Sequence, residues 1–102
     1  MKAHLHLICE ARHLYGEDVC VQQVPFLLGR HSDCNHQIWH PMVSRRHCEI
    51  RQNGDTFLIR DLKSSNGTYV NGRPIRDETP LKEGDEVRLG CVAFRVSFSN
   101  HN

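Results

Sequence analysis

Hydrophobic and polar residues alternate along most of the chain, and this alternation predicts β-strands. In residues 3–9, AHLHLIC, the apolar side chains at odd positions alternate with His4 and His6. In residues 92–98, VAFRVSF, apolar side chains occupy every even position. Successive side chains of a strand point to opposite faces, so each of these segments can bury one face and expose the other.

Further short runs of the same kind follow one another with turn signals between them. They comprise residues 18–24, 24–29, 47–51, 56–61, 68–70 and 85–90. Glycine-containing turns separate several of them, at residues 53–55, 64–67, 71–72 and 83–85. Helical periodicity is almost absent. Roughly ten short strands at this spacing predict an all-β sandwich of two antiparallel sheets, whose loops gather at its two ends.

The length of the chain fits one such sandwich. Its 102 residues are enough for one domain and too few for two ordinary ones. No repeat or linker divides it. We expect a single domain over residues 1–98, followed by a short polar tail over residues 99–102.

Composition and charge argue against several classes of function. The formal net charge is +1, a weak basis for nucleic-acid binding, which normally rests on a large basic surface. No apolar run approaches the length of a membrane span, and the N-terminus lacks the form of a signal peptide. Five cysteines without a tight pairing pattern favour free thiols and a reducing, cytoplasmic setting.

Arginine outnumbers lysine by ten to three, and some of these arginines lie in predicted loops beside hydroxyl side chains. The guanidinium group is a planar fork that suits phosphate and carboxylate. Three connections carry such groups: GRHSDC after the strand at 24–29, HPMVSRRH before the strand at 47–51, and DLKSSNGT before the strand at 68–70. Loops held on a rigid core are common positions for binding residues.

The ordered segments LLGR, VSRRHCEI, DLKSSNGTYVNG, LKEGDEVRLG and FRV resemble the forkhead-associated (FHA) domain family, from about residue 5 to residue 98. The resemblance implies an eleven-stranded, FHA/SMAD-like sandwich that binds phosphothreonine-containing proteins or peptides downstream of a serine/threonine kinase. It implies no catalytic residue, cofactor, metal, nucleic acid or membrane, and we expect a monomer.

The resemblance also assigns roles to single residues. Arg30 corresponds to the family's phosphate-gripping arginine, and Ser44 and Ser65 correspond to the hydroxyls that reach the phosphate. Asn66 corresponds to the asparagine that holds the peptide backbone. His47 corresponds to a histidine that braces the binding loops. A phosphothreonine carries almost two negative charges and three acceptor oxygens, and these groups supply matching donors.

Other residues are expected to support the loops or to tune specificity. The supporting set is Gly29, His47, Gly67, Asn71 and Gly72. Arg45 stands where the family often has asparagine, so it either adds a second cation at the phosphate or points into solvent. Met42, two residues before Ser44, suggests a preference for an uncharged or apolar flanking residue.

A hydrolase is one alternative. Ser44, His47 and Asp61 could be drawn as a catalytic triad. However, Ser44 lacks the G-x-S-x-G elbow, and no oxyanion loop is evident.

A metal site is a second alternative. Cys34, His36 and His40 form one loose cluster, to which His4 and His6 could add ligands. Structural zinc prefers two tight pairs of ligands in which cysteine is well represented.

A third alternative is a different kind of binding. Some FHA-like domains bind partners without phosphorylation or self-associate through a sheet face. Retention of Arg30, Ser44, Ser65 and Asn66 argues against a lost phosphate site, but it does not exclude a second surface.

Overall fold

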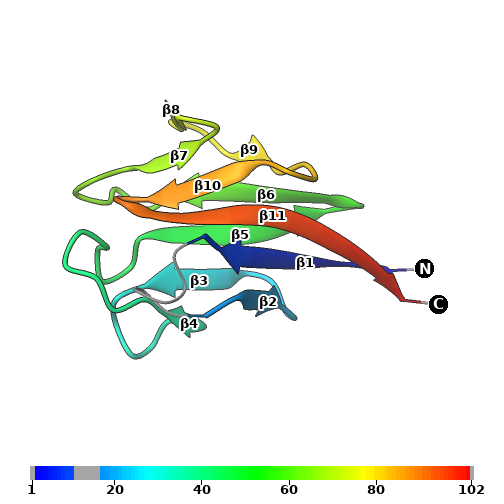
Figure 1. Ribbon diagram of the computed structural model, residues 1–102, viewed down its shortest axis with the longest axis horizontal. Coiled ribbons are helices and arrows are strands. Elements are labelled where there is room, and N and C mark those ends of the chain that lie inside the picture. Colours follow the sequence, from blue (N-terminus) through cyan, green and yellow to red (C-terminus); the bar gives the residue numbers. More distant parts are fainter. Residues whose placement is uncertain (1, 11–16, 102) are drawn as a thin grey trace.

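A computed structural model describes residues 2–10 and 17–101 and shows two sheets packed into a sandwich (Figure 1). The six-stranded sheet has the order β2-β1-β11-β10-β7-β8 and consists of β1 (Lys2–Cys9), β2 (Val19–Val21), β7 (Thr68–Val70), β8 (Arg73–Pro74), β10 (Glu86–Leu89) and β11 (Val92–His101). The five-stranded sheet has the order β4-β3-β5-β6-β9 and consists of β3 (Phe26–Gly29), β4 (His36–Gln37), β5 (Cys48–Asn53), β6 (Thr56–Asp61) and β9 (Thr79–Pro80). This architecture confirms the predicted sandwich.

The core forms where the predicted apolar faces of the strands meet. Leu5 and Leu7 of β1 are fully buried, as is Val96 of β11, which pairs with Leu7. In the other sheet, Ile50 of β5 pairs with Ile59 of β6, and both side chains are completely buried. The buried hydrophobic side chains of the described residues form one cluster that joins the two sheets.

Two details of the sheets differ from the sequence-based expectation. The pair β3–β4 is parallel, so the five-stranded sheet is mixed. The strands β4, β8 and β9 contain two residues each and were not predicted individually. Two residues cannot show an alternating pattern, so only their backbone pairing reveals them as strands.

The expected polar tail also needs correction. Residues 99–101 continue β11, because they pair with residues 2–4 of β1. The side chain of Ser99 is hydrogen-bonded to His6, with 2.8 Å between Oγ and Nε2. Backbone pairing does not require apolar side chains, and the polar composition of this segment was therefore misleading. Residue 102 lies outside the described residues.

The loops predicted to carry function gather at one end of the sandwich. Figure 1 shows the connections β3–β4, β4–β5 and β6–β7 at the end opposite the two termini. Val43, in the β4–β5 connection, is completely buried and anchors that loop on the core. No helix in the described part of the chain is long and apolar enough to cross a membrane.

Candidate functional site

Arg30 directly follows the last residue of β3 and is joined to the β4–β5 loop by two hydrogen bonds. Its backbone N–H donates to the carbonyl of Ser44 at 2.9 Å, and its Nε donates to the carbonyl of Val43 at 2.9 Å. The second bond uses only one of the five N–H groups of the guanidinium. The side chain is exposed, so its remaining donors can face a ligand.

Gly29 allows this close approach of two backbone segments. A Cβ atom at Gly29 would lie 2.1 Å from the carbonyl oxygen of Arg45. Any side chain would therefore push the β4–β5 loop away from the end of β3. The missing side chain of Gly29 thus lets the end of β3 lie directly against the β4–β5 loop.

His47 connects two of the loops. Its Nδ1 accepts a hydrogen bond from the backbone N–H of Ser44 at 3.0 Å, and its Nε2 lies 2.8 Å from the carbonyl oxygen of Gly67. Nδ1 can accept only in the neutral ring, so Nε2 carries the proton and donates to Gly67. His47 is fully buried, and this burial lowers its pKa below the usual histidine range. His47 thus joins the β4–β5 loop to the β6–β7 loop.

Ser44 and Ser65 are brought together from loops 21 residues apart in the sequence. The backbone N–H of Ser65 donates to Oγ of Ser44 at 3.0 Å. Because Oγ of Ser44 accepts this bond, its own hydroxyl proton can be donated elsewhere. Within the described residues no acceptor for that proton is found.

Asn66 fastens the same two loops at a neighbouring point. Its Nδ2 donates to the carbonyl of Met42 at 2.9 Å, which leaves its amide oxygen as an acceptor. Met42 is 39% exposed, an unusual position for a large apolar side chain, and it lies next to these contacts. Arg30, Ser44, Ser65, Asn66 and Met42 therefore belong to one surface.

The β6–β7 loop is shaped by a carboxylate that sequence analysis considered only as a possible catalytic acid. Asp61 accepts hydrogen bonds from the backbone N–H and hydroxyl of Ser64, and from the hydroxyl of Thr68 at 2.7 Å. Burial alone would raise the pKa of Asp61, but these hydrogen bonds outweigh it and lower the pKa. An acidic residue three positions before a serine is a turn signal, and it could have indicated this loop.

Gly67 ends this loop with a backbone conformation that side chains rarely adopt. Its φ is +85°, in agreement with the prediction that the N-G pair supplies a positive φ. Its carbonyl accepts from His47 and also from the backbone N–H of Gly90 at 3.1 Å. Gly90 thus helps to hold the site, although the sequence analysis did not single it out.

Arg45 and Arg46 are neighbours with different surroundings. Arg46 forms an ion pair with Asp33, with 2.6 Å between nitrogen and oxygen, and the hydrogen bond from Arg46 lowers the pKa of Asp33. The side chain of Arg45 is exposed, and no ion pair joins it to another described residue. Of the two, Arg45 is the one whose charge is available to a ligand.

Asn71 and Gly72 do not lie with these loops. They form the β7–β8 turn, at the opposite end of β7 from Gly67, and both have positive φ, of 53° and 81°. The side chain of Asn71 is hydrogen-bonded to Asp85 and to the backbone of Glu86. They stabilise this turn and do not support the candidate site, contrary to the prediction.

The three residues of the hypothetical triad are not arranged for catalysis. Both ring nitrogens of His47 bind backbone groups, and Oγ of Ser44 accepts from Ser65. Asp61 is hydrogen-bonded to the β6–β7 loop. A triad requires the histidine ring to bridge the serine hydroxyl and the acid, and that bridge is missing.

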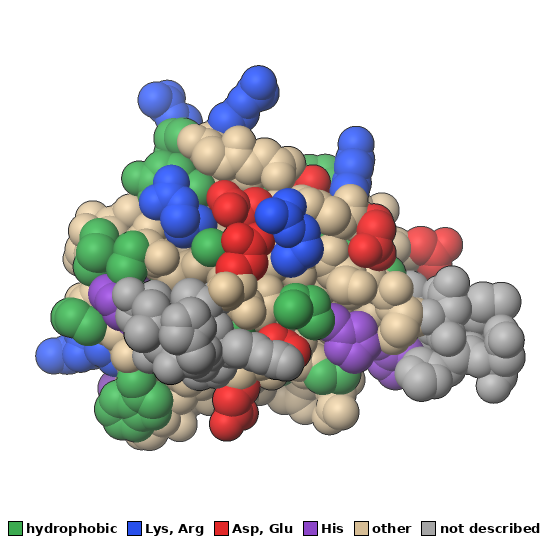
Figure 2. Space-filling model, viewed as in Figure 1, with side chains coloured by type: hydrophobic (Ala, Val, Ile, Leu, Met, Phe, Trp, Pro, Cys, Tyr) green, Lys and Arg blue, Asp and Glu red, His purple; other side chains and the backbone are tan. Residues whose placement is uncertain are grey.

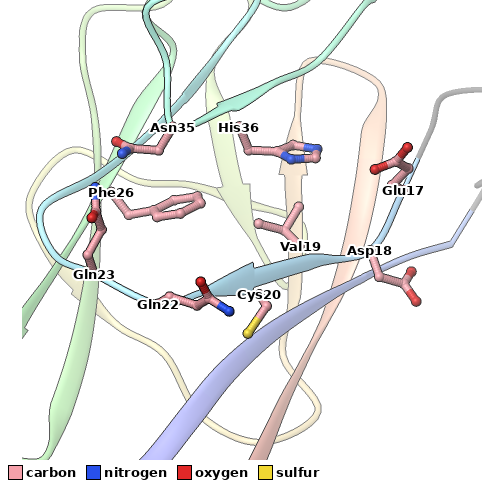
Figure 3. A pocket seen from close by; sticks show the side chains of 9 residues that line it. All are labelled: Glu17, Asp18, Val19, Cys20, Gln22, Gln23, Phe26, Asn35 and His36. Atoms are coloured by element: carbon pink, nitrogen blue, oxygen red, sulfur yellow. The ribbon is translucent and has the colours of Figure 1, made fainter.

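The hypothetical metal ligands are also dispersed. Sγ of Cys34 donates to the carbonyl of Arg45, and His40 contacts Sγ of Cys91. His36 lines a separate hollow of about 290 Å³ beside β2, where Figure 3 shows its ring on the same side as Glu17. Among the described residues there is no group of three or more side chains suited to a metal.

The arrangement as a whole is suited to binding an oxyanion. Arg30 brings a guanidinium with unused donors from the β3–β4 loop, Ser44 brings a hydroxyl with a free proton from the β4–β5 loop, and Ser65 of the β6–β7 loop is bonded to that hydroxyl. The exposed Arg45 follows Ser44 in the chain. Charge-assisted hydrogen bonds from such groups are about twice as strong as neutral ones. A phosphate presents three acceptor oxygens and nearly two charges, and it would satisfy these donors together.

Comparison with known proteins gives consistent matches. The family model for the FHA domain matches residues 26–90. The oxoglutarate dehydrogenase inhibitor of Corynebacterium jeikeium is 40% identical over 83% of this chain and 57% of its own length. The glycogen accumulation regulator GarA of Mycolicibacterium smegmatis is 46% identical over 81% of this chain and 51% of its own length. The chain thus spans little more than half the length of these curated relatives.

A solved structure is similar over almost the whole chain. It comes from a study of phosphothreonine-dependent FHA domain interactions and matches with a TM-score of 0.86 and 33% sequence identity. The match covers 96% of this chain and 99% of the other.

Proposed function

Because this chain belongs to the FHA domain family, we propose that it binds phosphothreonine in partner proteins through Arg30, Ser44 and Ser65. Arg30 grips the phosphate with its unused guanidinium donors, and the two serines contribute hydroxyls. Arg45 adds a second positive charge at the rim. Asn66 holds the partner's backbone beside the phosphothreonine, and Met42 contacts a flanking apolar residue.

The observation that carries the proposal is the bond between the backbone N–H of Ser65 and Oγ of Ser44. It joins two serines from distant loops and leaves the hydroxyl proton of Ser44 able to donate to a ligand. The backbone bond from Arg30 to the Ser44 carbonyl brings the arginine to the same point. Because these bonds hold Arg30, Ser44 and Ser65 in place beforehand, little conformational entropy is lost when a phosphate binds.

The proposal makes the domain a recognition module and not an enzyme. Its partners would be proteins phosphorylated by a serine/threonine kinase, as expected from the family. The similar structure from the study of phosphothreonine-dependent interactions supports this reading. A cytoplasmic location is part of the same proposal, and five free cysteines support a reducing compartment.

Fluorescence titration with three matched pools of degenerate peptides tests the proposal. The pools carry phosphothreonine, phosphoserine or threonine at one fixed position. We expect micromolar binding to the phosphothreonine pool, weaker binding to phosphoserine, which lacks the γ-methyl group, and none to threonine. Equal affinity for all three pools, or no binding to any of them, would refute phosphate recognition.

A further inference from the structure

A groove opens along the edge of the sandwich that carries β8 and β9. β8 is the last strand of the six-stranded sheet, β9 is the last strand of the five-stranded sheet, and residues 75–78 connect them. The groove has a volume of about 760 Å³. None of the residues of the candidate phosphate site lines it.

The two edge strands are poor templates for an added strand. Each has only two residues, and each contains a proline, Pro74 in β8 and Pro80 in β9. Proline has no backbone N–H to donate to a neighbouring strand, and short edges limit pairing further. A partner at this edge must therefore bind mainly through side-chain contacts in the groove.

Three cationic side chains line the groove without a partner of opposite charge. Arg73, Arg76 and Lys82 are exposed, and their charged groups form no ion pair or hydrogen bond with any described residue. Figure 2 shows Lys and Arg side chains projecting from the edge of the molecule that carries β8. By contrast, Arg51 and Arg60 are each paired with a glutamate.

The acidic residues of the groove offset this charge only in part. The carboxylate of Asp85 accepts hydrogen bonds from Asn71 at 2.9 Å and from the backbone N–H of Lys82 at 2.8 Å, so it is held in place in the groove. Asp77 is the other carboxylate in the lining. Three cations against two carboxylates leave the groove with one excess positive charge.

The groove also offers apolar surface. Pro74, Ile75 and Pro80 contribute to the lining, and Ile75 is partly buried against the hydrophobic core. Exposed cations and apolar side chains in one groove fit a polypeptide segment that combines carboxylates with an apolar side chain.

We propose that this groove is a second docking surface, which binds an unphosphorylated acidic segment with an apolar residue in a partner protein. Arg73, Arg76 and Lys82 attract the carboxylates, and the apolar residue packs on Ile75 and the two prolines. The groove and the phosphate site share no residue, so this docking surface is independent of phosphothreonine binding.

A nucleic acid fits this groove less well. No aromatic side chain lines the groove, so bases would have no ring on which to stack. An acidic protein segment meets the same cations without needing base stacking.

Fluorescence anisotropy with a labelled, phosphate-free peptide of glutamates, aspartates and leucines tests the proposal. The test variant is Arg73→Gln/Arg76→Gln, and the matched control is Arg60→Gln/Lys63→Gln, which removes the same charge outside the groove. We expect the test variant to bind roughly 3- to 10-fold more weakly than the control, the effect of losing two exposed ion pairs. A peptide with serine in place of leucine should also bind more weakly.

Four results would overturn the proposal. The first is that the wild-type protein binds the acidic peptide no more tightly than a peptide in which lysine replaces glutamate. The second is equal affinity of the two variants, with unchanged thermal unfolding showing that both fold. The third is tighter binding of a single-stranded oligonucleotide than of the acidic peptide. Arg30→Ala should leave acidic-peptide binding intact; a loss there would assign this peptide to the phosphate site and contradict the proposal.

Discussion

At the scale of single residues, the sequence indicates a role for Arg30 and the structure shows the contact that orients its side chain. The sequence marked it as an arginine after a strand-ending glycine, and the resemblance to the FHA family suggested phosphate binding. The structure adds that Nε is fixed on the carbonyl of Val43, so the guanidinium is held in one orientation. A side chain held in place before binding loses less entropy when the ligand arrives.

Replacing Arg30 by alanine should weaken phosphothreonine-peptide binding by roughly 10- to 150-fold, because a charge-assisted bond contributes about 1.5–3 kcal/mol. Arg51→Ala is the matched control, since Arg51 lies on β5 and is paired with Glu78. Calorimetric titration measures both affinities. An Arg30→Ala protein that binds as tightly as Arg51→Ala would contradict the role of Arg30.

The lowered pKa of His47 predicts that the stability of the protein depends on pH. Because burial lowers its folded pKa, the unfolded chain binds a proton more readily than the folded one. The free energy of unfolding should therefore be highest above the ordinary histidine pKa of about 6.5, and fall as the pH drops from there through the folded pKa, by at most about 1.4 kcal/mol per pH unit for each such group. Urea unfolding at a series of pH values measures this loss.

His36 contributes in the same direction, because burial lowers its pKa as well. The test therefore compares His47→Gln with His36→Gln. We expect each substitution to reduce the slope of the free energy of unfolding against pH below about pH 6.5. A slope that stays unchanged in His47→Gln would show that His47 is not held neutral in the folded protein.

The sequence could not separate neighbouring residues of the same type. Arg45 and Arg46 are equivalent in the pattern, and only the position of Asp33, on another loop, shows that Arg46 is paired. In the same way, Asn66-Gly67 and Asn71-Gly72 are both N-G pairs, but they lie at opposite ends of β7. Such differences arise from tertiary contacts that no local pattern encodes.

At the scale of elements, the long strands were predictable and the shapes of the loops were not. The alternation in β1 and β11 identified the buried face of each strand, and Leu5, Leu7 and Val96 are indeed buried. The β6–β7 loop depends on Asp61, whose bonds to Ser64 and Thr68 were not foreseen. A loop conformation results from many weak side-chain bonds, whereas a buried strand face results from one repeated pattern.

Gly29→Ala should disturb both stability and binding. Its Cβ would lie 2.1 Å from the Arg45 carbonyl oxygen, so the β4–β5 loop must shift, at a cost of about 1–3 kcal/mol typical of overpacking. Ser44 and Arg30 would separate, and phosphopeptide affinity would fall with the stability. Urea unfolding and peptide titration give the two readouts.

Gly54→Ala is the control for this substitution. Gly54 has a φ of +61° in the β5–β6 turn, and its Cβ would meet nothing within 4 Å. Alanine there should destabilise the domain by about 1–2 kcal/mol through its backbone conformation alone. Binding should remain unchanged, because this turn is remote from the phosphate site in sequence and in the sheet. Unchanged binding in Gly29→Ala as well would contradict the proposed close approach.

At the scale of the whole molecule, both sheets end in very short strands. β2 has three residues, and β4, β8 and β9 have two each. Short edges give little backbone for another sheet to pair with. The sandwich itself followed from the spacing of strands and turns, but the short edge strands became visible only through their pairing.

The domain should therefore be a monomer in solution. Sedimentation equilibrium over a wide range of concentration measures its mass directly. We expect the mass of one chain throughout that range. A dimer at low concentration would show that a sheet face or an edge is a self-association surface.

The central claim is that one phosphate is bound where the β3–β4, β4–β5 and β6–β7 loops meet. The most direct test is an NMR titration of isotopically labelled protein with a phosphothreonine peptide and its unphosphorylated twin. We predict large shifts at the backbone amides of Arg30, Ser44, Arg45, Ser65 and Asn66 with the phosphorylated peptide only. Shifts that are confined to a sheet face, or that are the same for both peptides, would contradict the account.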